Sequence, residues 1–347
     1  MLNSIYKLVS PRYFEKYYYD IGLNSDKIIV RPTHLSICNA DQRYYQGLRD
    51  KQILRKKLPM ALIHEGIGEV VYDPTNTYKV NERVVMIPNN PTEKNSVIRE
   101  NYLRSSLFCS SSRDGFMQEY IPLNKDRIVK LPDFMPNNVA AFTELVTVSY
   151  HVIERFNQFS HQIKNTIGVF GDGNLGFITA LLLKKIFPTS QIYVFGIHPN
   201  KLHNFSFADK TFNSYEIPED VKIDHAFECV GGNSSSIAIN QIIDIINPQG
   251  TISLMGVSED NASVNTRMVL EKGLVIFGSS RSGRADFVGL IELYKKHPDI
   301  VEYLENIVGT EILIKNIQDI KKAFEIDINK EIGKTILIWD ERKIEGD

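Results

Sequence analysis

The sequence predicts an α/β protein built from a β-rich domain and a doubly wound parallel-sheet domain. Its 347 residues are about twice the usual length of one domain. Between Asp26 and Pro132, short apolar runs alternate with turn residues, a pattern typical of β-rich domains with Greek-key or barrel-like connections. From Lys164 onward, strand-like runs alternate with helix-length segments, which indicates βαβ units and a parallel sheet.

Each predicted element follows from a local apolar run. The β-rich domain is predicted to have strands at residues 27–31, 68–72, 82–88, 116–122 and 126–132. The second domain is predicted to have strands at 166–171, 191–196, 224–230, 251–256 and 274–280, with helices at 175–187 and 234–246. An amphipathic segment after Arg284 and a strand at 333–339 follow. We therefore expect one domain at residues 1–149 and 286–347 and the other at 150–285.

Composition and charge exclude several classes of protein. Lys and Arg number 40 against 42 Asp and Glu, a formal charge of −2, so no general attraction to nucleic acid or an anionic membrane is expected. The sequence contains no apolar run of membrane-spanning length and no signal-peptide-like start. Cys38, Cys109 and Cys229 are odd in number and scattered, which argues against a disulfide framework and favours a reducing compartment. We expect a cytoplasmic protein without nucleic-acid or membrane partners.

A glycine-rich segment opens the second domain. Gly171, Gly173 and Gly176 form G-x-G-x-x-G, with Asn174 and Leu175 between the last two, after one apolar run and before a helix-compatible one. In that context the glycines permit a tight turn and close approach of the main chain to a pyrophosphate at a helix N-terminus. The alternative is a turn that merely contains glycines. The flanking strand and helix favour a dinucleotide site.

The end of the next predicted strand indicates which dinucleotide binds. An Asp or Glu there would hydrogen-bond the ribose 2′-hydroxyl of NAD(H), but this chain has Gly196, followed by His198 and Lys201. These two basic residues could receive a 2′-phosphate, so NADPH is predicted, although both could also be solvated loop residues. Small or apolar residues after later strands are expected to flank the cofactor: Val230, Gly231, Gly256 and Ser280.

Metal-type residues are spread over the first 144 positions. Cys38, His64, Glu65 and Glu144 offer thiolate, imidazole and carboxylate groups, which are the ligands that Zn²⁺ prefers. Taken singly, Cys38 could be a small buried apolar residue and His64 a core histidine. Glu144 lies inside an apolar run, where a carboxylate is costly unless it is paired or bound to metal. We expect it at the cleft between the two domains.

Together these residues resemble the zinc-dependent medium-chain alcohol and polyol dehydrogenases over nearly the whole chain. Within that family, the segments at 36–45, 171–176, 227–232 and 278–283 are similar to those of ribulose-5-phosphate reductases. The resemblance implies a GroES-like catalytic domain and a Rossmann domain. It also implies one catalytic zinc at Cys38, His64, Glu65 and Glu144, with the two glutamates alternating or binding through water, and Asp41 as the carboxylate that orients a zinc-bound imidazole.

Three departures from the family pattern sharpen the prediction. Residues 88–113 contain only Cys109, so the four-cysteine structural zinc of many relatives is not expected. Ala40 stands where the family usually has the hydroxyl of a proton relay, so the proton would have to come through zinc-bound water or Glu65. Arg43 stands where a relay histidine often follows, which suggests an anion site. Arg43 and Arg281 are predicted to bind a substrate phosphate, with Arg49 as a weaker candidate.

The resemblance implies NADPH-dependent reduction of D-ribulose 5-phosphate to D-ribitol 5-phosphate, which would feed CDP-ribitol for cell-wall teichoic acid or capsule. It further implies a functional pairing with a ribitol-5-phosphate cytidylyltransferase and a homo-oligomer, expected to be a dimer. One alternative is an NAD-dependent polyol dehydrogenase acting on an unphosphorylated sugar alcohol, which needs no anion site near Cys38. Another is a non-catalytic dinucleotide-sensing protein, which has no need of four metal-type residues.

Overall fold

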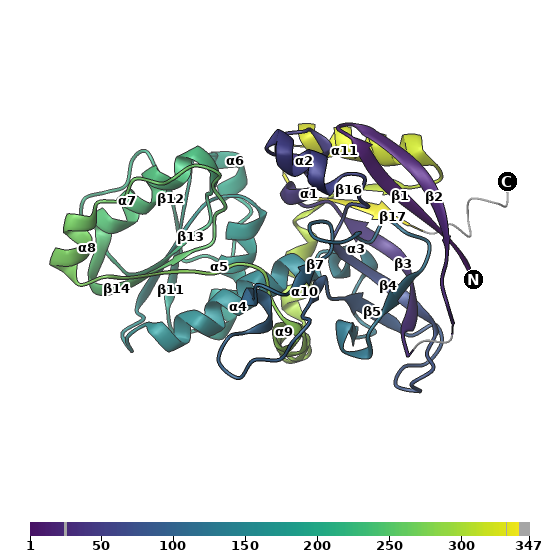
Figure 1. Ribbon diagram of the computed structural model, residues 1–347. Helices are drawn as coiled ribbons and strands as arrows, with labels where there is room; N and C mark the ends of the chain where they lie inside the picture. The colour runs from purple at the N-terminus through teal and green to yellow at the C-terminus, as the bar shows by residue number, and fades with distance from the viewer. Residues whose placement is uncertain (24–25, 331, 340–347) are drawn as a thin grey trace. The chain divides into compact units, whose positions relative to one another are not determined.

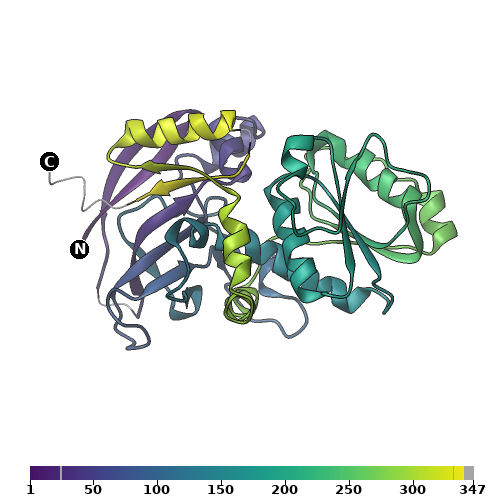
Figure 2. The same cartoon turned by 180° about the vertical axis from the view of Figure 1, so that it is seen from behind.

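The computed structural model describes residues 1–23, 26–330 and 332–339, which fold into two units (Figures 1 and 2). The first unit comprises Met1–Leu145, Ser282–Lys296 and Ile307–Asp347, and the second comprises Val146–Arg281 and His297–Asn306. These boundaries lie within four residues of the expected ones, except that His297–Asn306 groups with the second unit. Helix α4 (Thr143–Phe159) contains residues of both units.

Unit 1 is built around a seven-stranded sheet. Six of its strands follow one another in the order β16-β17-β3-β4-β5-β9, and β8 also pairs with β3. All pairs are antiparallel except β16 with β17. The strands are β3 (Ile28–Ser36), β4 (Glu65–Tyr72), β5 (Arg83–Met86), β8 (Ile121–Leu123), β9 (Ile128–Lys130), β16 (Val308–Leu313) and β17 (Lys334–Ile338). Of the strand predicted at 116–122, only β8 forms.

An antiparallel hairpin that the sequence analysis missed precedes this sheet. It pairs β1 (Leu2–Ser10) with β2 (Tyr13–Asp20), and β2 buries only Phe14. A strand with a single buried residue lacks the alternation by which strands are recognised in a sequence. Phe14 packs against Phe324 of helix α11 (Ile317–Asn329), with ring centroids 5.5 Å apart. Figures 1 and 2 both show α11 lying along the hairpin.

The remaining elements of unit 1 are short, apart from the 13-residue helix α9 (Arg284–Lys296). Tyr45 of α1 (Asn39–Tyr45) packs against both aromatic rings just named, with its ring centroid 5.8 Å from that of Phe14 and 4.7 Å from that of Phe324. The others are α2 (Lys51–Lys57), β6 (Asn89–Asn90), β7 (Leu107–Phe108), α3 (Asn137–Ala140) and α9 (Arg284–Lys296).

Unit 2 is a six-stranded parallel sheet with the order β12-β11-β10-β13-β14-β15. The strands are β10 (Thr166–Phe170), β11 (Gln191–Gly196), β12 (Lys210–Asn213), β13 (Ile223–Glu228), β14 (Ile246–Leu254) and β15 (Val275–Gly278). The helices are α5 (Asn174–Ile186), α6 (Pro199–Leu202), α7 (Ser235–Ile245), α8 (Thr266–Lys272) and α10 (Asp299–Glu305). Figure 1 shows α5 and α7 on opposite faces of the sheet, as in a doubly wound fold.

The strand order reverses between β10 and β13, and this is where such sheets bind their ligands. The glycine-rich segment follows β10 directly, at that point. The predicted α/β class, with a β-rich domain and a doubly wound domain, is confirmed. Within the described residues, no helix is both long enough and apolar enough to cross a membrane.

Candidate metal centre and dinucleotide site

Cys38 occupies the turn between β3 and α1. It is the N-cap of α1, with extended backbone angles, and its main-chain N–H donates to Asp41 Oδ2 at 3.2 Å. This reciprocal cap fixes the position of the Cys38 thiol and the direction of the Asp41 side chain at once. Asp41 is fully buried and also accepts hydrogen bonds from the Ile63 N–H and the Ser110 hydroxyl.

His64 follows a strained residue. Ile63 has φ of 69°, a left-handed conformation that a β-branched side chain rarely adopts. Two contacts hold it there: its N–H donates to Asp41, and its carbonyl accepts the Phe116 N–H at 2.7 Å. Gly115 passes so close that a Cβ on it would stand 2.3 Å from the Ile63 carbonyl oxygen. A bare backbone at Gly115 is therefore required for the turn that presents His64.

Opposed charges surround the His64 imidazole. Its Nδ1 lies 3.5 Å from Asp41 Oδ1, and both side chains are buried. Burial disfavours the imidazolium, but Asp41 and Cys38 outweigh it, so the pKa of His64 is raised. Burial, together with the Glu65 carboxylate, raises the pKa of the Cys38 thiol, an effect that His64 partly offsets. Asp41 thus faces His64 from the side expected of a carboxylate that orients a metal-bound imidazole.

Glu65 is paired with a buried lysine that the sequence analysis did not single out. Lys334 on β17 is 3% exposed, and its ammonium lies 2.9 Å from both carboxylate oxygens of Glu65. Only Oε1 meets hydrogen-bond geometry, so Oε2 of this fully buried carboxylate accepts no hydrogen bond from the described residues. Lys334 also donates to the Ile37 carbonyl at 2.8 Å, next to Cys38. A buried carboxylate oxygen that accepts no hydrogen bond has a lone pair that could bind a metal ion.

Cys38, His64 and Glu65 come together as one group of metal-type ligands. Their ligating atoms lie within 4.8 Å of one another. A thiolate, an imidazole and a carboxylate with an unused oxygen fit Zn²⁺ at a three-residue catalytic site. Glu144 is not part of this group, but it is buried and close enough for Glu65 to act on its charge. Burial, reinforced by the Glu65 carboxylate, raises the pKa of Glu144.

The predicted phosphate-binding arginines fall in different units. Arg43 is half-buried on α1, where burial and the nearby Arg49 lower its pKa. The Arg49 guanidinium lies over the Tyr44 ring, 5.0 Å from its centroid. Arg281 is exposed and belongs to unit 2, with φ of 58°. Within unit 1, the structure therefore brings Arg43 together with Arg49, the candidate that the sequence ranked lower.

The glycine-rich segment of unit 2 has the geometry of a main-chain cradle. Gly171 has φ of 128°, and a Cβ at Gly176 would lie 1.9 Å from the Gly171 carbonyl oxygen. Gly173 caps helix α5, and a Cβ there would meet no atom within 4 Å. Two glycines thus shape the loop, and the third keeps open the space before the helix N-terminus where a pyrophosphate would approach.

The end of β11 corrects one premise of the cofactor prediction. Asp172, inside the glycine loop, accepts the N–H groups of Ile197 and His198, each at 2.8 Å, and lies 3.0 Å from His198 Nδ1. A carboxylate does therefore stand at the end of β11. It lies against the His198 ring, which was expected to bind the 2′-phosphate of NADPH. A Cβ on Gly196 would stand 2.6 Å from the Asp172 Cβ, so the close packing of Asp172 requires a glycine at position 196. Lys201, on α6, is half-buried.

A second carboxylate shapes the neighbouring strand ends. The buried Glu228 accepts the N–H groups of Val230 and Gly231 through Oε1 and that of Gly256 through Oε2. A Cβ on Gly256 would lie 2.2 Å from the Gly231 nitrogen. Glu228 therefore ties together the ends of β13 and β14. The signal was visible in the sequence as an acidic residue at the end of an apolar strand.

Comparisons with known proteins agree with this arrangement. The zinc-binding dehydrogenase model matches residues 192–296, and the alcohol dehydrogenase GroES-like domain model matches residues 24–133. The ribulose-5-phosphate reductase of Bacillus spizizenii is 54% identical over 98% of this chain and 100% of its own length. Ribulose-5-phosphate reductase 1 of Staphylococcus aureus is 55% identical over 98% of this chain and 99% of its own.

A solved structure extends the likeness to three dimensions. The crystal structure of S. aureus TarJ in complex with NADPH has a TM-score of 0.88 at 49% identity, covering 98% of this chain and 100% of the other. Both halves of the chain match models of one enzyme family, and the relatives match from end to end. The chain therefore belongs to the zinc-binding, alcohol-dehydrogenase-like oxidoreductases and resembles their ribulose-5-phosphate reductases.

Proposed function

We propose that this protein reduces D-ribulose 5-phosphate to D-ribitol 5-phosphate with NADPH. The observation that carries the proposal is the buried group of Cys38, His64 and Glu65, whose thiol, imidazole and carboxylate ligand atoms lie within 4.8 Å of one another. The relatives named above, more than half identical over nearly their whole length, supply the substrate. The S. aureus structure with NADPH supplies the cofactor.

Several residues of unit 1 have separate roles in the reduction of the substrate carbonyl. When bound, zinc supplies Lewis-acid polarisation of the substrate oxygen, and NADPH supplies the hydride. Cys38, His64 and Glu65 would hold the ion, and Glu144 would replace or assist Glu65. Asp41 orients the His64 ring. Ala40 has no hydroxyl, so it cannot relay a proton, and the proton must reach the product oxygen by way of Glu65 or water.

Arg43 is proposed to bind the substrate phosphate together with Arg49. The two guanidiniums are close enough for one to depress the pKa of the other, an arrangement that an anion would stabilise. Arg43 also lies on the helix that Cys38 begins, five residues beyond that ligand. A phosphate bound there would be near the metal centre.

The test compares substrates with and without the phosphate. Arg43→Ala should reduce kcat/KM for ribulose 5-phosphate by roughly ten- to a hundredfold, the loss of one charge-assisted hydrogen bond. Residual turnover of ribulose should change little, because that substrate has no phosphate to lose. Both substrates are assayed with NADPH and NADH on metal-analysed protein. Arg55→Ala, on the neighbouring helix α2, controls for loss of a positive charge.

Three outcomes would overturn parts of the proposal. If Arg43→Ala slows both substrates equally, Arg43 is structural and the phosphate binds elsewhere. If the unmodified protein prefers ribulose or a sugar alcohol with NAD, the protein is a plain polyol dehydrogenase. Protein that binds NADPH but holds no zinc and turns over neither substrate would be a dinucleotide sensor.

We further propose one zinc per chain, because residues 88–113 contain a single cysteine and a structural site needs four ligands. The product would serve CDP-ribitol synthesis for teichoic acid or capsule, with a ribitol-5-phosphate cytidylyltransferase as the next enzyme. We also propose a homodimer located in the cytoplasm. The three cysteines form no disulfide, which fits that reducing compartment. Metal analysis and sedimentation measure the first and last of these.

A further inference from the structure

Helix α1 carries Arg43, the residue proposed to bind the substrate phosphate, and the metal ligand Cys38 begins the helix. The helix has only seven residues, too few to be stable without contacts to the rest of the protein. A small rotation of α1 about its axis would redirect the Arg43 guanidinium. The contacts that fix α1 within unit 1 therefore decide where that guanidinium lies.

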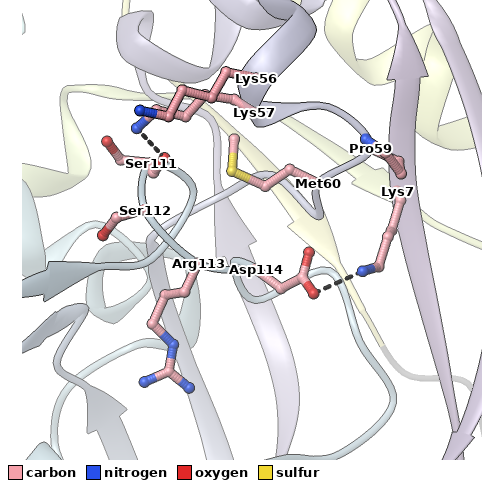
Figure 3. A pocket seen from close by; sticks show the side chains of 9 residues that line it. All are labelled: Lys7, Lys56, Lys57, Pro59, Met60, Ser111, Ser112, Arg113 and Asp114. Atoms are coloured by element: carbon pink, nitrogen blue, oxygen red, sulfur yellow. Dashed lines mark hydrogen bonds and ion pairs between the residues drawn. The ribbon is translucent and has the colours of Figure 1, made fainter. Parts of the chain in front are cut away.

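One anchor of α1 lies at its N-terminal end. Asp41 accepts hydrogen bonds from the main-chain N–H of Ile63 and from the hydroxyl of Ser110. The loop that contains Ser110 is itself held in place, because the Lys57 ammonium donates to the carbonyl of the next residue, Ser111 (Figure 3). This anchor fixes the end of α1 that lies next to the metal centre.

The second anchor is Gln42, which is 5% exposed and contacts helix α11 instead. Its amide nitrogen donates to the Phe324 carbonyl at 2.9 Å and to Asp327 Oδ2 at 2.8 Å. Its amide oxygen accepts a hydrogen bond from Gln46, one turn further along α1, at 3.2 Å. Both donors of one side chain are thus used on the same neighbouring helix. Such a pair of bonds opposes rotation of α1 about its axis.

Asp327 makes this second anchor strong. Its carboxylate is buried, and Oδ1 forms an ion pair with Lys330, whose side chain is 21% exposed. A buried carboxylate needs both a counter-charge and hydrogen-bond donors. Lys330 supplies the charge, and Gln42 supplies a donor to the other oxygen. The bond from Gln42 is therefore charge-assisted, and bonds of that kind are roughly twice as strong as neutral ones.

Arg43 follows Gln42 directly in the helix. Adjacent helix residues point about 100° apart, so the direction of Gln42 determines the direction in which Arg43 leaves the helix. We propose that Gln42 and Asp327 are positioning residues for the substrate phosphate, which they act on by fixing the rotation of α1. This inference rests on the function proposed above, in which Arg43 binds that phosphate. It gives α11, which carries no metal ligand, a part in substrate selection.

The experiment uses Gln42→Met, which keeps the length of the side chain and removes both donors. KM for ribulose 5-phosphate should rise by about three- to tenfold, a part of the loss expected for Arg43→Ala. The value of kcat should stay the same, because the phosphate does not take part in the reaction at the carbonyl. KM for ribulose should not change. Zinc content should not change either, because Asp41 keeps its own anchor.

Three further variants test the path from α11 to the phosphate. Asp327→Asn keeps an acceptor for the Gln42 amide and should keep KM near its original value, whereas Asp327→Ala should behave like Gln42→Met. Tyr45→Phe is the matched control, because it removes a different hydrogen bond between α1 and α11, the one to Glu325, and should leave KM unchanged. Adding Gln42→Met to Arg43→Ala should cause no further rise in KM.

Several results would overturn the inference. If Gln42→Met raises KM equally for both substrates or lowers the zinc content, Gln42 only stabilises unit 1. If the effects of Gln42→Met and Arg43→Ala add in full, Gln42 does not act through Arg43. If Arg43→Ala alone leaves KM unchanged, the proposed phosphate site fails and this inference falls with it. Melting curves show which variants are folded, and the two Asp327 variants carry the test if Gln42→Met is not.

Discussion

The two ligand sites of this protein are built by opposite means. The metal centre of unit 1 consists of ionisable side chains, Cys38, His64 and Glu65, buried together with Lys334 from a distant part of the chain. The dinucleotide site of unit 2 consists of main chain, brought close by glycines and tied by two carboxylates, Asp172 and Glu228. In unit 1 a substitution should therefore remove a chemical group. In unit 2 it should change the path of the backbone.

The largest effect should come from removing the metal thiolate. Cys38→Ser should lose zinc and all measurable reductase activity together, while the far-ultraviolet circular dichroism and NADPH binding of the protein stay as they were. The reason is that the ligand group lies in one unit and the cofactor loop in the other. Loss of NADPH binding in this variant would show that the two sites do not separate in this way.

The next effect concerns the buried pair of Glu65 and Lys334. Lys334→Met should destabilise the metal-free protein by about 3–5 kcal/mol, because it leaves a buried carboxylate without a counter-charge. Urea unfolding of the metal-free single variant, beside the original protein, measures this loss of stability.

A double variant provides the control for that measurement. Adding Glu65→Gln to Lys334→Met removes the stranded charge and should recover part of the lost stability. If the single variant is as stable as the original protein, the pair is not buried in solution as it is here.

A matched pair of glycines tests the backbone site. Gly176→Ala places a Cβ against the Gly171 carbonyl and should destabilise unit 2 by about 1–3 kcal/mol, with loss of NADPH binding. The Cβ that Gly173→Ala adds meets no protein atom. This substitution should therefore weaken NADPH binding while leaving the stability of the apoprotein unchanged. Calorimetric scanning with and without NADPH measures both. Equal destabilisation by the two variants would contradict this division of roles.

The smallest effect expected is on cofactor preference. Lys201→Ala should lower the preference for NADPH over NADH by about tenfold, as loss of one charged contact to the 2′-phosphate implies. His198→Ala should do less, because its ring already lies against Asp172. The ratio of kcat/KM with NADPH to kcat/KM with NADH measures this preference in each variant. A stronger effect from His198 would mean that Asp172 releases it when the cofactor binds.

This contrast also explains what could be predicted from the sequence. The glycine loop is a local pattern, with its strand before it and its helix after it, so its role was readable from adjacent residues. Asp172 and Glu228 accept their hydrogen bonds mainly from main-chain N–H groups, which leave no side-chain pattern in the sequence, and both residues were missed. Lys334 lies 269 positions from Glu65, and only the folded sheet shows that they meet. The first hairpin was missed because β2 buries a single residue.

Gly115 shows how a residue without a side chain can govern a site built from side chains. It carries no ligand, donates no proton and binds no substrate, yet any larger residue there would collide with the carbonyls of Leu62 and Ile63. Those carbonyls belong to the turn that sets the direction of His64. Selection at this position thus preserves the absence of a side chain. In the natural variation of such a protein, Gly115 should tolerate exchange as poorly as the histidine whose place it secures.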